Sequence, residues 1–152
     1  MRNKRGEGYI SICVMVLVIC MLLSATIVFA GAVNTVSLAE RNAKTVLDSY
    51  IMKNSITIYN SIKNGHNYTE SLNADEYTAD LCSFSSLTQD GEYLTAKNGS
   101  YSITQPAVGF TTDNRLKLYA SFTVYVPIEF NGVVVQTEEV PITVTANFDE
   151  KF

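Results

Sequence analysis

The uncharged run near the N-terminus constrains the fold more than any other feature of this chain. Residues 9–33 read YISICVMVLVICMLLSATIVFAGAV, and the uncharged stretch extends to Ala39. A helix rises about 1.5 Å per residue and the hydrocarbon core of a bilayer is about 30 Å thick, so about 20 apolar residues span it. The run has no polar face, because Ser11, Ser24 and Thr26 can bond to carbonyls of their own helix. It therefore predicts a transmembrane helix over residues 9–33.

The residues before this run predict its orientation. The basic leader, residues 1–8, carries Arg2, Lys4 and Arg5 against a single acidic residue, Glu7. Basic residues next to a membrane span stay on the cytoplasmic side. We therefore expect a span of the cytoplasmic membrane with its N-terminus inside and the C-terminal domain outside, at the cell surface.

The remainder of the chain is acidic and long enough for one domain. Beyond Val33, 8 basic residues stand against 14 acidic ones, a net charge of −6. Binding to the phosphates of a nucleic acid needs a basic surface, so this charge argues against a nucleic-acid partner. The remaining 119 or so residues suffice for one core but are few for two.

Cleavage by signal peptidase is the competing interpretation of the run. Ala30-Gly31-Ala32 has the small-x-small form of a cleavage site, and a cut after Ala32 would release a secreted or tethered extracytoplasmic binding module. The apolar region of a secretory signal is about 7–15 residues long, whereas about 21 residues of the run precede Ala30. This length favours a retained anchor.

The helix is predicted to continue outward over residues 34–64. No proline interrupts it, and apolar residues recur at helical spacing along one side. Lys63-Asn64-Gly65 provides an end, since glycine readily adopts the left-handed cap conformation. We expect one helix from the leader to the end of this segment, bent near Gly31. The apolar positions are Ala39, Ala43, Val46, Leu47, Tyr50, Ile51, Ile58 and Ile62.

Residues 65–152 are predicted to form a small α+β domain that packs on this helix. Asn73 and Glu76 have the spacing of a capping box, which predicts that a short second helix begins there. Asp90-Gly91 is expected to end it. The apolar stripe of this second helix consists of Tyr77, Leu81, Phe84 and Leu87.

From residue 93 the apolar period changes from about 3.6 to 2, which predicts antiparallel strands. Short strands are expected at 93–96, 100–105 and 108–111, followed by two long ones. The long strands carry alternating apolar residues at Leu116, Leu118, Ala120, Phe122, Val124, Val126 and Ile128 and at Val140, Ile142, Val144, Ala146 and Phe148. Turns are expected at Asn98-Gly99, Asp113-Asn114 and Asn131-Gly132.

The turn at Asn131-Gly132 sets how the two long strands pair. A two-residue turn would place even residues opposite odd ones and send the second apolar set to the wrong face. A three-residue loop with a glycine bulge instead pairs Phe122 with Val140. We predict the three-residue loop, unless a bulge near 137–139 restores the register.

Together these elements predict an α+β fold in which one long N-terminal helix covers an antiparallel sheet, with one short extra helix. Pro127 and Pro141 fall on the outward-facing set, which places them near strand ends or on an edge. Tyr119 and Tyr125 also point outward. They either form a contact surface or, as we expect, are covered by the short helix. The expected core contact joins Val46, Tyr50 and Ile58 to Phe122, Val140 and Ile142.

No arrangement typical of a catalytic or metal site occurs in the sequence. The one histidine, His66, has no neighbouring cysteine, and a lone histidine forms neither a zinc site nor a triad. Adjacent carboxylates such as Glu138-Glu139 point to opposite faces of a strand. Cys82 is the single cysteine of the domain, so no disulfide closes within it. We expect no catalytic residue, no cofactor, no metal and no enzymatic activity.

The leader carries the most specific signal. Lys4-Arg5-Gly6-Glu7-Gly8-Tyr9-Ile10, followed at once by the apolar run, resembles the start of the pilin-like proteins of tight-adherence (type IVc) pilus systems, including the TadE-like proteins. The layout of basic leader, long apolar helix and small β-rich domain is similar as well. The specific match covers about thirty residues at the N-terminus.

This resemblance implies a function in assembly at the membrane or on a pilus. Pilins are cut by a prepilin peptidase after a glycine, and Gly6 and Gly8 are the candidates here. The implied partners are the lipid bilayer, that peptidase, other pilin-like subunits and the membrane proteins of pilus assembly. In pilins a glutamate five residues into the mature chain aids assembly, but a cut after either glycine leaves Ser11 or Cys13 there. The missing glutamate favours a minor pilin or pseudopilin over a major subunit.

Small residues at the outer end of the run suit lateral helix packing. They are Ala25, Ala30, Gly31 and Ala32. Small side chains let two helix backbones approach closely in a membrane or in a filament core. We therefore expect these positions to contact neighbouring subunits.

Overall fold

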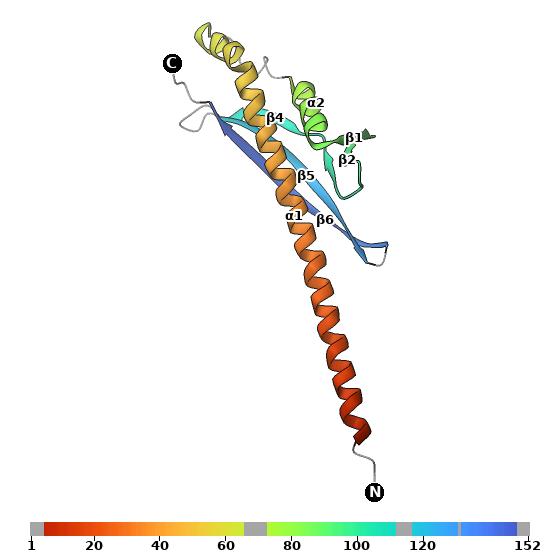
Figure 1. Cartoon of the computed structure of the whole chain (residues 1–152). Helices are drawn as coiled ribbons and strands as arrows, with labels where there is room; N and C mark the ends of the chain where they lie inside the picture. Colours follow the sequence, from red (N-terminus) through yellow and green to blue (C-terminus); the bar gives the residue numbers. More distant parts are fainter. Residues whose placement is uncertain (1–4, 66–72, 112–116, 131, 149–152) are drawn as a thin grey trace.

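The computed structural model describes residues 5–65, 73–111, 117–130 and 132–148. Two helices lie on one face of a curled antiparallel sheet, and the N-terminal half of the long helix projects well beyond it (Figure 1). The predicted α+β fold is confirmed. The elements are α1 (Arg5–Lys63), α2 (Ala74–Ser85), β1 (Leu87–Asp90), β2 (Tyr93–Ala96), β3 (Ser102–Thr104), β4 (Ala107–Thr111), β5 (Lys117–Phe130) and β6 (Val133–Asn147).

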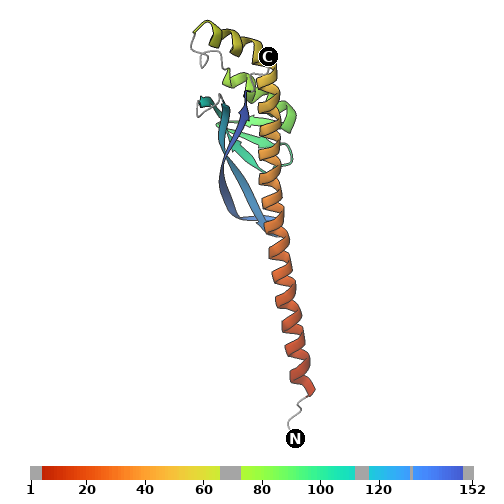
Figure 2. The ribbon, with the colours of Figure 1, turned by 90° about the vertical axis from the view of Figure 1, so that its left-hand side faces the viewer.

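α1 runs without interruption from the leader through the apolar run into the domain. It passes Gly31 without the predicted bend, and its direction changes only in the last turns, drawn in yellow in Figure 2. At the start of these turns Asn54 Nδ2 donates to the carbonyl of Tyr50 (3.1 Å) and Ser55 Oγ to that of Met52 (2.9 Å). Bonds of this kind also occur at Thr26, Thr35, Thr45 and Ser49 in the straight part of α1, so they do not by themselves account for the position of the bend.

The end of α1 and the start of α2 lie where the sequence predicts them. Gly65 adopts a φ of +66° and its N–H donates to the carbonyl of Ile62 (3.2 Å), which ends α1. Asn73 Oδ1 accepts from the backbone N–H groups of Asp75 (3.1 Å) and Glu76 (3.3 Å). Asn73 is therefore the N-cap of α2.

Replacing Asn73 by alanine is expected to lower the free energy of unfolding by about 1 kcal/mol, because two N–H groups of the first turn lose their acceptor. Urea unfolding of the detergent-solubilised protein, followed by circular dichroism, measures the change. Asn73→Asp keeps an acceptor oxygen and is the control. Equal losses in the two variants would contradict the capping role.

The end of α2 corrects one prediction. The helix stops at Ser85, because Ser86 adopts a φ of +53°, and Leu87 begins strand β1 instead of extending the helix. Phe84, predicted to lie on the apolar stripe, is 57% exposed. The glycine predicted to end the helix, Gly91, turns β1 into β2 with a φ of +63°.

β5 is the central strand of the sheet. β3 and β4 pair with one of its edges and β6 with the other, while β1 and β2 extend the sheet beyond β3. β6 is thus an edge strand among the described residues, and Pro141 lies on it. Pro127 lies beyond the end of the β3 pairing, so both prolines occupy the predicted kind of position. The turn predicted at Asp113-Asn114 lies outside the described residues.

The β5–β6 hairpin contradicts the predicted three-residue loop. Phe130 pairs with Val133, which leaves a two-residue turn. The register shifts next to it, between Ile128 and Glu129, because β6 holds one unpaired extra residue, Val135. This bulge restores even-to-even pairing, as the apolar pattern requires, but every later pair is displaced by two residues from the prediction.

The core lies between α1, α2 and the even-numbered face of β5 and β6. The sequence predicts the cover by α1, whereas it does not predict the contribution of α2 to this core. Tyr50 and Phe122 are buried in one cluster, whereas Val140 is only partly buried. Ala32 and Val36 are the first residues of α1 that pack against this cluster, so the preceding turns have no contact with it. The largest fully buried side chains are Tyr50, Tyr77, Leu47, Ile58, Leu81, Leu94, Ile103, Leu118 and Val124.

The tyrosines of the outer face pack on the sheet itself. Tyr125 stacks edge-on with Tyr93, with their ring centroids 5.5 Å apart. The ring of Tyr119 lies over Gly109, so closely that a Cβ added to Gly109 would meet the tyrosine hydroxyl at 2.5 Å. α2 packs on the opposite face, against α1 and β1, so the prediction that it covers these tyrosines is wrong.

Candidate functional site

The apolar run of α1 is the strongest candidate for a functional surface. α1 is long and apolar enough to cross a membrane, and none of its most apolar 18-residue stretch is buried inside the protein. Met21 and Leu22, for example, are 67% and 64% exposed. The hydroxyl of Thr26 donates to the carbonyl of Leu22 (2.8 Å), so it is satisfied within the helix as predicted. A helix that is apolar on all sides and uncovered by its own domain is suited to lipid, which supports membrane anchoring.

The four small residues predicted for helix packing divide between two sides of α1. Ala25 faces a groove beside the β5–β6 hairpin, and Ala32 packs against the domain core. Ala30 and Gly31 are exposed and line neither, and a Cβ added at Gly31 would meet nothing within 4 Å. Ala30 and Gly31 are thus the two small positions that leave space for another helix.

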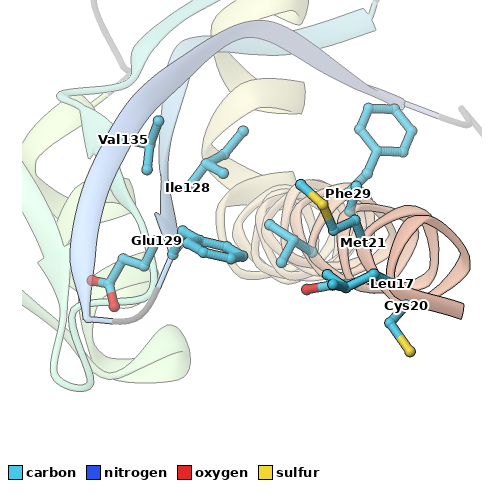
Figure 3. A pocket seen from close by; sticks show the side chains of 11 residues that line it. Leu17, Cys20, Met21, Phe29, Ile128, Glu129 and Val135 are labelled. Atoms are coloured by element: carbon cyan, nitrogen blue, oxygen red, sulfur yellow. The ribbon is translucent and has the colours of Figure 1, made fainter. Parts of the chain in front are cut away.

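A groove, here called the hairpin groove, separates the apolar run from the β5–β6 hairpin. It has a volume of about 630 Å³, with α1 as one wall and the hairpin as the other (Figure 3). Side chains between residues 17 and 29 line the first wall, and residues 128–130 with Val135 line the second. Among the described residues that line it, only Ser24 and Glu129 have oxygen-bearing side chains, and the carboxylate of Glu129 points away from α1 (Figure 3). The groove is therefore apolar.

The residues that flank the turn of the hairpin also present apolar side chains outside the groove. We define the hairpin tip as Phe130, Val133, Val134 and Val135, which are 61%, 64%, 52% and 68% exposed. Phe130 and Val135 line the hairpin groove, whereas Val133 and Val134 do not. The sequence patterns predict neither the groove nor the tip. Three consecutive valines after the turn nevertheless indicate an apolar hairpin end.

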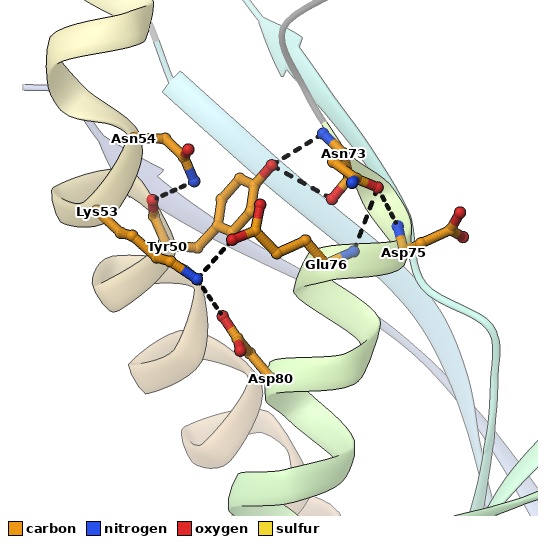
Figure 4. Close-up of polar contacts among 7 residues, drawn as sticks. All are labelled: Tyr50, Lys53, Asn54, Asn73, Asp75, Glu76 and Asp80. Carbon is orange, nitrogen blue, oxygen red and sulfur yellow. Dashed lines mark hydrogen bonds and ion pairs between the residues drawn. The ribbon is translucent and has the colours of Figure 1, made fainter.

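Tyr50 and Lys53 join α1 to the start of α2 (Figure 4). The Tyr50 hydroxyl donates to the Asn73 carbonyl (3.2 Å) and accepts from the Asn73 N–H (2.9 Å). Lys53 Nζ forms ion pairs with Glu76 (2.5 Å) and Asp80 (3.8 Å), and its hydrogen bond to Glu76 raises the pKa of Lys53. The predicted capping box is therefore only half formed, because Tyr50 takes the Asn73 N–H and Lys53 takes the Glu76 carboxylate.

Tyr77 makes the second link between the two helices. Its hydroxyl donates to the carbonyl of Ala43 (3.1 Å), and its ring stands edge-on to that of Tyr50 at a centroid distance of 6.0 Å. The side chain is fully buried. Burial raises the pKa of Tyr77, of Tyr50 and of Tyr101 above the ordinary phenol value of about 10.

The domain is expected to lose stability as the pH rises above about 10. Below that pH the phenols are protonated in both states, whereas above it the folded state retains protons that the unfolded chain releases, so the free energy of unfolding falls. Tyr77 alone contributes a slope of up to about 1.4 kcal/mol per pH unit. Urea unfolding across this pH range measures the slope. A Tyr77→Phe variant should have a shallower slope, and an unchanged slope would contradict this assignment.

Three of the five residues predicted for membrane orientation and processing lie at the start of α1. Arg5, Gly6 and Gly8 belong to its first turns, so both candidate cleavage positions have helical backbone. Arg2 and Lys4 lie outside the described residues.

The described part of the chain contains no candidate metal site, and its cysteines are the reactive groups to consider. Within it, no group of three or more His, Cys, Asp or Glu side chains could hold a metal ion, and His66 lies outside it. Cys13 and Cys20 are exposed on α1, while Cys82 is half-buried. Burial raises the pKa of the Cys82 thiol, which lowers the fraction of reactive thiolate.

Comparison with known proteins identified no relative of this chain. No protein-family model, no curated protein and no solved structure matches the chain. The resemblance of the leader to pilin-like proteins therefore rests on its own residues.

Proposed function

We propose that this protein is a single-pass, membrane-anchored pilin-like component, a minor pilin or pseudopilin, of a tight-adherence pilus or a related secretion assembly. The observation that carries the proposal is the continuity of α1. One helix presents an uncovered apolar run at one end and forms part of the domain core at the other. A rigid connection of this kind transmits the position of the anchor directly to the domain, as a subunit built into an assembly requires.

The basic leader supports an orientation in the cytoplasmic membrane with the N-terminus inside and the domain outside. In this arrangement the protein acts through helix packing and subunit contacts, without catalysis. Ala30 and Gly31 supply the close approach to a neighbouring helix, since they are exposed and face away from the groove. The absence of a glutamate at the fifth position of either candidate mature chain favours a minor pilin or pseudopilin over a major subunit.

Expression with and without a prepilin peptidase, followed by mass spectrometry of the intact protein, tests the proposal. We expect a peptidase-dependent mature chain that begins at Glu7 or at Tyr9, together with co-purification of pilus assembly proteins. Gly31→Ala is the matched control, because it changes a glycine outside the leader at a position with free space. It should be processed like the unchanged chain.

Two results would contradict the proposal. One is a chain that stays unprocessed and never co-purifies with assembly proteins. The other is a soluble product that begins at Val33, which would identify the alternative, a binding module released by signal peptidase after Ala32.

A further inference from the structure

The α1 wall of the hairpin groove lies at the level of the membrane wherever the span is placed within the apolar run. A span needs about 20 residues, and the charge of Glu7 precedes the run, so a span that starts at Tyr9 ends near Val28. The α1 wall of the groove extends from Leu17 to Phe29, about 18 Å along the helix. Almost all of this wall lies inside such a span, and a span placed nearer the domain would include all of it.

The β5–β6 hairpin therefore extends beside the part of α1 that is suited to lipid (Figures 1 and 2). A hairpin with polar side chains on both sides of its turn could not remain there, but in this one the apolar hairpin tip flanks the turn. Phe130 and Val135 face the groove, and Val133 and Val134 are exposed outside it. The tip has apolar side chains both within the groove and outside it, so it is suited to an apolar environment on several sides. Because the tip lies beside the apolar run of α1, that environment is lipid.

We propose that the hairpin tip is a second membrane anchor, which enters the outer leaflet of the bilayer while a phospholipid acyl chain occupies the hairpin groove. This inference rests on the proposed anchoring of α1 in the membrane. α1 and the hairpin then hold the domain against the bilayer at two points, which fixes its tilt relative to the membrane surface. A domain with a fixed tilt presents the same face to its partners in every copy of the protein.

The backbone of the hairpin limits the depth of the tip. The outer edges of β5 and β6 near the turn have no strand partner among the described residues, and unpaired N–H and C=O groups are costly in hydrocarbon. The tip consequently sits at the boundary of headgroups and acyl chains, where water still reaches its backbone and its side chains enter the hydrocarbon. This depth requires a span that begins close to Tyr9.

The charges near the tip indicate which lipids it binds. No basic residue is among the described residues that line the groove. The Glu129 carboxylate points away from α1, and Glu138 accepts a hydrogen bond from Gln136 Nε2 (2.6 Å). Insertion is therefore driven by burial of apolar side chains, with no attraction to anionic headgroups. It should occur in zwitterionic phosphatidylcholine and should not be strengthened by phosphatidylglycerol.

Depth-dependent fluorescence quenching in the full-length protein tests this inference. A polarity-sensitive fluorophore is attached at Val134→Cys, and the protein is placed in phosphatidylcholine vesicles that contain lipids with a quencher on the acyl chain. Thr145→Cys is the matched control, since it is exposed on the same strand about 36 Å away. Leu22→Cys, on the side of the run that does not line the groove, reports whether α1 itself is in the membrane. The natural cysteines Cys13, Cys20 and Cys82 are replaced by alanine, or Cys82 is retained where its replacement abolishes the circular dichroism signal.

We expect the label at position 134 to be quenched several-fold more than the label at position 145, and most strongly by quenchers near the headgroup end of the acyl chain. Quenching at position 22 with none above the control at position 134 would overturn the second anchor and leave the proposed function standing. A lack of quenching at position 22 would overturn both. A signal at position 134 that disappears when the protein is diluted with lipid would identify a second copy of the chain as the occupant and would also overturn the inference.

Discussion

Replacing Tyr77 by alanine is expected to lower the free energy of unfolding of the domain by about 3–5 kcal/mol, the range observed when a large buried aromatic side chain is removed. The Tyr77 side chain is fully buried between α1 and α2. It stacks against Tyr50 and donates a hydrogen bond to the carbonyl of Ala43 on α1, so one substitution removes a ring contact and a hydrogen bond that hold α2 against α1. Urea unfolding in a detergent that keeps the apolar run in solution, followed by circular dichroism, measures the loss.

Two variants separate the contributions of Tyr77. Tyr77→Phe keeps the ring and removes only the hydrogen bond to the Ala43 carbonyl, so it should cost about 1 kcal/mol. Phe84→Ala removes an aromatic side chain from the same helix at a position that is 57% exposed, and it should change the stability by less than about 0.5 kcal/mol. If Tyr77→Ala were no more destabilising than Phe84→Ala, the placement of α2 against α1 would be wrong.

The contrast between Tyr77 and Phe84 shows where the sequence stops being informative. Both residues, together with Leu87, fit a single helical stripe, because positions three, four and seven apart share a helix face. The helix nevertheless ends at Ser85, since Ser86 adopts the left-handed conformation, and Leu87 enters the core from a strand. Apolar spacing cannot distinguish a helix that continues through Leu87 from one that ends before it, because Leu87 is buried in both arrangements.

The sheet illustrates the same limit for pairing. The alternation from Leu118 to Val126 predicts which face of β5 is buried, because side chains of a strand alternate between two faces. It also requires even-to-even pairing with β6, which the structure shows. A three-residue loop and a two-residue turn with a bulge at Val135 both satisfy this requirement, so the pattern leaves the choice between them open.

The hairpin groove depends on structure that no local pattern describes. The run in α1 and the valines at the end of the hairpin are at least 100 residues apart in the chain. They lie side by side because β5 and β6 extend beyond the other strands along α1 toward the N-terminus. The sequence therefore predicts the span and the strands individually, whereas their juxtaposition requires the folded structure.

Two arginines placed in the run are expected to remove the protein from the membrane. Val18 and Leu22 are 50% and 64% exposed, do not line the hairpin groove, and lie near the middle of the run. Arg near the centre of a span costs about 3 kcal/mol and the lost apolar residue a further few tenths, so Val18→Arg with Leu22→Arg costs about 6–8 kcal/mol. The 13 Leu, Ile, Val and Phe residues of the run contribute about 4–8 kcal/mol to insertion, so the double substitution cancels most or all of it.

The fraction of protein that stays in the membrane pellet after an alkaline carbonate wash measures this loss. Met52→Arg with Ile56→Arg is the matched control, because these residues have the same spacing on the same helix and are 78% and 74% exposed, but lie beyond the run. The control should stay in the pellet like the unchanged protein, since its arginines remain in water on the outer side. Equal loss from the pellet in both double variants would show that residues 52–56 also contact lipid, whereas retention of the Val18 and Leu22 variant would show that the run is held by protein and not by lipid.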